Sequence, residues 1–248
     1  MQIKKNLFIL IGASRGLGEA LYEEISSRND NYIVLVNRKK TVSGHIHGIK
    51  EIKCDLSKPI SYKKLSDIFS GIFQCSYDSM TLVCNASVLG PIDFVGTLDP
   101  ASIEALWNVN IVNHVLFINE FIRQSKKCVG PKKRILAISS GAAVSPHGGI
   151  ALYCATKAAL EMLVRTIFEE QKTEQCVEIA TIRPGIMDTD MQKHIRSASS
   201  ESFHDVGIYR KLKIDKKLLP PAFVAKKLYE FLLVQKQWES PVIDISTL

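Results

Sequence analysis

The sequence lacks long apolar runs, a secretory signal and paired cysteine motifs. Its longest apolar runs, such as LFILI at 7–11, are far shorter than the roughly 18 residues that predict a membrane-spanning helix. MQIKKNLFIL at the N-terminus lacks the apolar length and the small-residue cleavage pattern of a secretory signal. We therefore predict a cytoplasmic protein that makes no use of a membrane.

The six cysteines form no C-x-x-C pair and have no histidine at metal-ligand spacing. Neither a zinc site nor a disulfide framework is expected, and no metal is predicted. We expect small buried side chains or free thiols at Cys54, Cys75, Cys84, Cys128, Cys154 and Cys176.

The formal charge of +7 raises the question of nucleic-acid binding. The basic residues, however, occur in short separate groups, such as RKK at 38–40 and PKKR at 131–134, without interleaved aromatic residues or a recognition motif. This pattern is typical of a solvated surface, and an anionic small molecule is the better candidate partner.

The 248 residues are 46% hydrophobic and contain no Pro-, Gly- or Ser-rich linker, which predicts one domain. Helical spacing of apolar residues at 101–127, 152–170 and 221–235 lies between short β-rich runs, several of them apolar on consecutive positions. This alternation predicts an α/β fold: one doubly wound Rossmann-type domain with a mostly parallel sheet of about seven strands and helices on both faces. The expected strands are 7–11, 32–36, 49–53, 81–84, 134–138, 177–182 and 241–245.

A glycine-rich turn, IGASRGLGEAL, follows the first expected strand and contains Gly12, Gly16 and Gly18. Glycine permits a tight turn and a close approach of the main chain to a pyrophosphate, and the following helix offers free N–H groups. The segment predicts a dinucleotide site, with an ordinary strand-to-helix turn as the alternative.

The second strand ends in Asn37, Arg38 and Lys39, where an NAD enzyme of this architecture keeps an acidic residue. Positive charge there suits a 2′-phosphate, and Ser14 and Arg15 can complete the pocket. We predict NADP(H) as the cofactor. The alternative is that RKK is a solvated loop, which applies most to Lys40.

Six motifs occur in the order typical of one family: GASRGLG, NAS at 85–87, NVN at 108–110, ISS at 138–140, YCATK at 153–157 and RPGIMDT at 183–189. Over nearly its whole length the chain resembles the short-chain dehydrogenase/reductase family. The resemblance implies a catalytic tetrad of Asn110, Ser140, Tyr153 and Lys157.

The chemistry of this tetrad is physically reasonable. A ketone that accepts hydride needs a proton at the same moment, and a lysine one helical turn after Tyr153 can lower the pKa of its phenol. Ser140 would hold the carbonyl oxygen, and the family places Asn110 beside a water that links Lys157 to solvent. Ser139 competes with Ser140, but the 13-residue spacing to Tyr153 favours Ser140.

The resemblance also implies cofactor contacts: Asp55 at the adenine, Asn85 and Ala86 at the ribose, and Pro184, Gly185 and Thr189 at the carboxamide. Leu17, Leu56 and Ser87 complete the expected cofactor set, in which Tyr153 and Lys157 also take part. Two positions depart from the family: Ile11 replaces the usual Thr and Ser87 the usual Gly. Both are expected beside the cofactor and away from the chemistry.

Within the family, ALYCATKAALEML and RPGIMDTDMQ look particularly like the sepiapterin reductase and bacterial benzil reductase groups. This implies NADPH-dependent reduction of a bulky ketone or vicinal diketone. Asp244 matches an aspartate that anchors pterin in the first group, and a solvent-facing strand aspartate is the alternative. Besides Ser140 and Tyr153, the expected substrate contacts are Leu89, Met187 and Met191, with Trp107 as a further wall candidate; all four could instead be ordinary core.

Residues 187–220 are polar and lack strand patterning, which predicts a substrate lid. The family usually pairs through the helices at 101–127 and 152–170, so a homodimer or homotetramer is expected. The alternative function is a non-catalytic NADPH-binding regulator of the same fold, which the intact tetrad disfavours.

Overall fold

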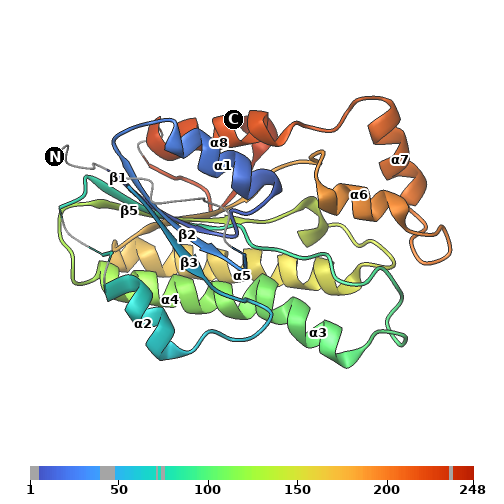
Figure 1. Ribbon diagram of the computed structural model, residues 1–248, viewed down its shortest axis with the longest axis horizontal. Coiled ribbons are helices and arrows are strands. Elements are labelled where there is room, and N and C mark those ends of the chain that lie inside the picture. The colour runs from blue at the N-terminus through green and yellow to red at the C-terminus, as the bar shows by residue number, and fades with distance from the viewer. Residues whose placement is uncertain (1–5, 40–47, 71, 74–75, 235–236) are drawn as a thin grey trace.

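Seven short segments of the chain form one parallel sheet. The computed structural model describes residues 6–39, 48–70, 72–73, 76–234 and 237–248. The strand order is β3-β2-β1-β4-β5-β6-β7, and every neighbouring pair is parallel, which confirms the predicted doubly wound α/β fold (Figure 1). The strands are β1 (Asn6–Ile11), β2 (Asn31–Asn37), β3 (Ile49–Lys53), β4 (Ser79–Cys84), β5 (Lys132–Ile138), β6 (Glu178–Arg183) and β7 (Val242–Asp244).

Helices cover both faces of the sheet. Figure 1 shows α1 (Gly16–Ser26) and α8 (Pro221–Val234) on one face, and α2 (Tyr62–Ser70), α4 (Asn113–Ser125) and α5 (Ala151–Glu174) on the other. Successive side chains of a strand point to opposite faces, so β1 contributes to two apolar cores. Leu7 and Ile9 belong to the core under α2, α4 and α5, whereas Phe8 and Leu10 belong to the core under α1 and α8.

The predicted helix at 101–127 is interrupted. It consists of α3 (Pro100–Trp107), a five-residue π-helix η1 (Asn108–Val112) and α4. Asp99 caps the start of α3, where its carboxylate accepts a hydrogen bond from Ser102 N at 2.9 Å. The apolar spacing predicted the helical stretch, but it gave no signal for the π-turn, which frequently marks a functional site.

The segment after β6 contains two helices, α6 (Asp190–Ser197) and α7 (Val206–Ile214), which extend past the sheet at one end of the molecule (orange, Figure 1). A parallel bridge between Met187 and Leu219 joins the two ends of this segment. The segment predicted as a lid therefore contains two helices, and the bridge between Met187 and Leu219 holds its two ends together.

Cys128 is disulfide-bonded, which corrects the expectation of thiols throughout. Pairing depends on the distance between two Cα atoms in the fold, and the spacing of cysteines along this chain did not reveal it. Cys54, Cys84, Cys154 and Cys176 are free thiols, and Cys75 lies outside the described residues, as does Lys40.

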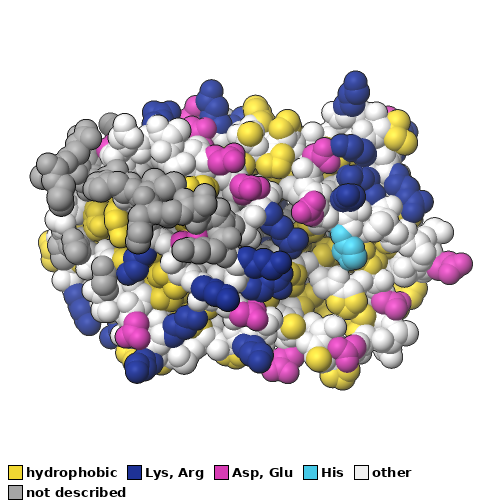
Figure 2. Space-filling view, viewed as in Figure 1, with side chains coloured by type: hydrophobic (Ala, Val, Ile, Leu, Met, Phe, Trp, Pro, Cys, Tyr) yellow, Lys and Arg dark blue, Asp and Glu magenta, His cyan; other side chains and the backbone are white. Residues whose placement is uncertain are grey.

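Within the described part of the chain no helix is long and apolar enough to cross a membrane. In the same residues no three His, Cys, Asp or Glu side chains gather closely enough to hold a metal ion. Lys and Arg side chains on the face drawn in Figure 2 are spread among acidic and apolar ones.

Candidate active site

The glycine-rich turn joins β1 to α1 with very little free space. Gly12 has a φ of +85°, and a Cβ on it would lie 2.6 Å from the Cα of Ala86. A Cβ on Gly18 would collide with the Gly12 carbonyl oxygen and lie 2.5 Å from Nδ2 of Asn85. Only glycine fits these positions, so the main chain itself forms the surface of the turn. The start of α1 opens onto this surface, and the arrangement fits a dinucleotide phosphate.

Polar side chains at the ends of β2 and β4, the two strands that flank β1, fix the turn. Asn85 Nδ2 donates to the Gly12 carbonyl oxygen at 2.5 Å, and Asn37 Oδ1 accepts from Ala13 N at 2.7 Å. Asn37 is only 2% exposed and also donates to Glu51 Oε1. The predicted cofactor residues Asn37 and Asn85 therefore support the turn with their amides, while Ala86 packs directly against it.

Basic side chains lie at the carboxyl end of β2. Arg38 and Lys39 are exposed, as are Ser14 and Arg15 in the turn. Asp55 follows β3, and its pKa is lowered mainly by hydrogen bonds from Ser57, with a smaller contribution from the positive charge of Arg38. Arg38 is therefore near Asp55 at the sheet edge, while the next predicted cofactor residue, Leu56, is 7% exposed and belongs to the core.

Tyr153 lies in the first turn of α5 with 8% of its surface exposed. Burial raises the pKa of its phenol to about 12, while hydrogen bonding with Ser140 and, more weakly, with Ser87 acts in the opposite direction. Ser140 Oγ also accepts a hydrogen bond from Ala142 N at 3.2 Å. The predicted pair of Tyr153 and Ser140 is thus brought together by α5 and the loop after β5.

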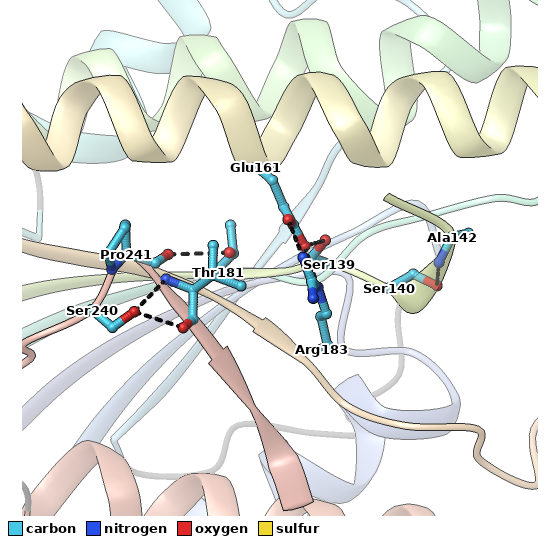
Figure 3. A network of polar contacts seen from close by, with 9 residues as sticks. Ser139, Ser140, Ala142, Glu161, Thr181, Arg183, Ser240 and Pro241 are labelled. Carbon is cyan, nitrogen blue, oxygen red and sulfur yellow. Dashed lines mark hydrogen bonds and ion pairs between the residues drawn. The ribbon is translucent and has the colours of Figure 1, made fainter. Parts of the chain in front are cut away.

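The competing serine, Ser139, is engaged elsewhere. It is 2% exposed, and its hydroxyl donates to Glu161 Oε1 at 2.7 Å (Figure 3). This geometry favours Ser140 as the hydroxyl that faces Tyr153, as the spacing predicted.

Lys157 lies one turn after Tyr153, with Nζ 5.6 Å from the centre of the Tyr153 ring. Burial lowers the pKa of this ammonium to about 8. The expected lowering of the Tyr153 pKa by Lys157 does not decide the net value, because the pKa of the phenol is raised in the structure. The physical reason is that burial of the phenol dominates.

Asn110 lies in the π-helix η1 and is completely buried. Its side-chain amide accepts from Val88 N at 2.9 Å and donates to Val88 O and to Thr156 Oγ1 at 2.9 and 3.1 Å. The amide therefore ties α5 to the loop after β4, and the predicted tetrad residues lie within one connected region.

Ser87 was expected beside the cofactor and away from the chemistry, but the structure places it at Tyr153. Its hydroxyl donates to Asn110 Oδ1 at 3.3 Å and is a hydrogen-bond partner of Tyr153. A serine in place of the family's usual glycine is the sequence signal for this role.

An apolar cluster surrounds Tyr153. It contains Leu89, Ile195, Phe203 and Val206 as buried members, and Met191 packs against it. Two of the predicted wall residues, Leu89 and Met191, therefore lie at the site. Met187 instead packs against the core under α1 and α8, and Trp107 is not among the residues of the cluster around Tyr153.

The residues after β6 adjoin the glycine-rich turn. Pro184 is buried, Gly185 has a φ of +74°, and a Cβ built on Gly16 would lie 3.4 Å from Cγ2 of Thr189. Thr189 also caps α6. Gly16 in the glycine-rich turn and Thr189 after β6, both predicted to contact the cofactor, therefore lie next to each other.

Asp244 is exposed at the end of β7, in register with Arg183 of β6. Its Oδ1 accepts hydrogen bonds from Ser246 N and Ser246 Oγ at 2.9 and 2.6 Å, and these lower its pKa. The carboxylate thus caps the turn Ile245–Thr247, a local role that neither sequence interpretation anticipated.

Known proteins share this sequence and architecture. Benzil reductase ((S)-benzoin forming) of Bacillus subtilis is 32% identical over 91% of this chain and 93% of its own. Sepiapterin reductase of Bos taurus is 26% identical over 79% of this chain and 78% of its own. Among solved structures, the KRED1-Pglu enzyme has a TM-score of 0.78 at 24% identity, covering 96% of this chain and 98% of that one.

Structures with the same fold have been solved with either nicotinamide cofactor. ElxO with NADP bound has a TM-score of 0.76 at 21% identity, over 98% of this chain and 97% of that one. 3-Ketoacyl-(acyl-carrier-protein) reductase from Brucella melitensis, complexed with NADH, has a TM-score of 0.73 at 18% identity, over 98% and 96%. These likenesses concern the fold and leave the choice of cofactor to this chain's own residues.

The family model of the short chain dehydrogenases matches residues 6–200, which include the glycine-rich turn, Ser140, Tyr153 and Lys157. The chain belongs to the short chain dehydrogenase family of oxidoreductases.

Proposed function

We propose that the protein is an NADPH-dependent carbonyl reductase that transfers hydride to a bulky ketone or vicinal diketone, with Tyr153 as the proton donor. The observation that carries this proposal is the convergence of Tyr153, Ser140 and Lys157 in one buried region. When bound, NADPH supplies the hydride. Ser140 holds the carbonyl oxygen, and Tyr153 donates the proton that the new alkoxide requires.

The state of Tyr153 suits the direction of reduction. A phenol whose pKa is raised to about 12 stays protonated at neutral pH and is available as an acid. The charged form of Lys157, near the ring, favours the phenolate that forms when this proton leaves. Burial around Tyr153 strengthens these interactions, because charges are poorly screened there.

NADPH is preferred over NADH in this proposal because Arg38 and Lys39 are exposed at the end of β2 and Arg15 is exposed in the turn. A guanidinium offers a two-pronged donor to a phosphate, whereas the ribose hydroxyl of NADH calls for an acceptor. Asp55, whose pKa is lowered in part by the charge of Arg38, already accepts a hydrogen bond from Ser57 N at 3.0 Å.

The bulk and apolarity of the substrate are supported by the cluster around Tyr153, which draws on α6 and α7. The benzil reductase relatives have substrates of this kind by name. A sepiapterin-like substrate is the second candidate, because Asp244 is exposed at the end of β7 and accepts the hydrogen bonds from Ser246 through Oδ1 alone.

We further propose that two copies pair through α4 and α5. A groove of about 510 Å³ runs between these helices, with Val115, Ile118, Leu163 and Ile167 among its lining residues. Paired helices from a second copy would cover this apolar surface. The cytoplasm remains the proposed location and a small carbonyl compound the proposed partner.

The test follows NADPH oxidation by absorbance with benzil, sepiapterin and a simple aliphatic ketone. We expect turnover of benzil and little turnover of the simple ketone. NADPH binding without turnover of any carbonyl would support the non-catalytic regulator instead. Asp244→Asn separates the two substrate classes, because only sepiapterin turnover should fall if this carboxylate anchors a pterin.

A further inference from the structure

A buried ionic network lies directly behind the predicted catalytic residues. Glu161 Oε1 accepts from Ser139 Oγ at 2.7 Å and from Arg183 Nε at 2.8 Å, and Glu161 Oε2 pairs with the Arg183 terminal nitrogen at 2.7 Å. Figure 3 shows Glu161 descending from the long helix α5 to meet the two side chains at the strand ends. The carboxylate accepts three hydrogen bonds from these two residues, and Glu161 is 4% exposed.

Each partner is next to a part of the site. Ser139 immediately precedes Ser140, Arg183 immediately precedes Pro184, and Glu161 lies one helical turn after Lys157. Lys157 itself reaches the sheet at the Ile138 carbonyl oxygen, at 2.8 Å. The network therefore connects α5 to the carboxyl ends of both β5 and β6, which are the elements that present Ser140, Tyr153 and the residues after β6.

Burial makes this connection rigid. A carboxylate removed from water is stable only when its partners replace its hydration, so rotation of Glu161 away from Ser139 or Arg183 is strongly disfavoured. Its pKa is lowered despite burial, chiefly through Arg183 and Ser139, so it stays ionised at neutral pH. The apolar contacts of α5 with the sheet permit small sliding motions, whereas this two-pronged ion pair fixes both position and rotation.

We propose that Glu161 is a positioning residue for the reduction: together with Arg183 and Ser139 it fixes α5 against β5 and β6, so that Ser140 and Tyr153 meet the carbonyl oxygen in one geometry. This inference rests on the proposed function. Glu161 makes no contact with substrate in this proposal, and it acts only through the elements that it joins.

The test compares Glu161→Gln with Glu169→Gln, a neutralisation of an exposed glutamate on the same helix. In Glu161→Gln the amide nitrogen faces a guanidinium N–H in either orientation of the amide, because Arg183 donates to both carboxylate oxygens of Glu161, so one of the two hydrogen bonds from Arg183 is lost. We expect kcat with benzil to fall by about 10- to 100-fold, with the NADPH dissociation constant within about twofold of wild type. Glu169→Gln should leave both values unchanged.

Ser139→Ala supplies a second variant that folds even if Glu161→Gln does not, because it only removes one hydroxyl. We expect it to lower kcat by about 3- to 10-fold at unchanged NADPH affinity. In the Glu161→Gln background the same change should add almost nothing, because both substitutions break one connection.

The rates are expressed per bound NADPH, so a loss of folded protein does not count as a loss of kcat. A wild-type rate per bound NADPH in both Glu161→Gln and Ser139→Ala, even with a lowered Tm, would overturn the positioning role and leave the reductase intact. If the wild type reduces no carbonyl compound, the proposed function fails, and the positioning role fails with it.

Discussion

Lys157 Nζ donates a hydrogen bond of 2.8 Å to the carbonyl oxygen of Ile138, the last residue of β5. Lys157 is 1% exposed, and this contact attaches the second turn of α5 to the sheet. Because burial lowers the pKa of the ammonium to about 8, its charge is lost within the range in which enzymes are assayed.

The first prediction follows from that pKa. The charged form of Lys157 predominates below pH 8, so kcat/KM for benzil reduction should fall as the pH rises through about 8. The measurement is a profile of kcat/KM from pH 6 to pH 10. A flat profile across this range would show that turnover does not depend on the charge of Lys157.

Tyr153→Phe removes the proton donor and leaves the ring in place. Turnover should fall by roughly 10²- to 10⁴-fold, because general acid catalysis is lost. NADPH affinity, measured by fluorescence titration, should change little. Tyr62→Phe, at a residue that is 66% exposed on α2, is the matched control and should keep wild-type turnover. Retained activity in Tyr153→Phe would remove Tyr153 from the proposed chemistry.

Arg38→Asp reverses the charge at the end of β2. The NADPH dissociation constant should rise by about 10- to 100-fold, because one charge-assisted pairing with phosphate is lost, while that of NADH should not rise. Lys226→Asp makes the same change at an exposed position of α8 and serves as the control. Equal weakening of both cofactors by Arg38→Asp would place the 2′-phosphate elsewhere.

His114 provides a prediction about acid stability. It is fully buried on α4, and burial, assisted by the charge of Lys157, lowers the pKa of its imidazole from 6.5 to about 3. Between these values the unfolded chain binds a proton that the folded chain does not, so unfolding becomes easier as the pH falls from 6.5 to 3. His114→Leu should remove this component.

The measurement is urea unfolding of both proteins at pH 7 and pH 4. The free energy of unfolding should fall by about 3 kcal/mol less in His114→Leu than in the wild type, the value expected for one such shift over this interval. Comparing the two pH values within each protein cancels any packing defect of leucine. An identical pH dependence would show that His114 takes up its proton in the folded state.

The sequence predicted all seven strands. The five central strands β2, β1, β4, β5 and β6 have apolar residues buried on both sheet faces, which gives a strong pattern, whereas the edge strands β3 and β7 are only partly buried. It also predicted the region where Tyr153, Ser140 and Lys157 meet. It did not predict the partners of buried polar groups, such as Ser139 with Glu161, or the contact of Ser87 with Asn110. These contacts join residues about 20 positions apart whose meeting depends on the rotation of helices over the sheet, which hydrophobic spacing leaves undetermined.

Tyr153, Lys157 and Glu161 of α5 are spaced four positions apart, whereas a helical turn takes 3.6 residues, so each step advances by about 40° around the helix axis. Tyr153, Lys157 and Glu161 therefore follow a slow spiral. Because of this rotation, Lys157 contacts the end of β5, whereas Glu161 contacts residues at the ends of both β5 and β6. The pitch of one helix thus distributes chemically different side chains to successive strands. One residue inserted between 153 and 161 would rotate Glu161 by about 100° and aim it away from both strands.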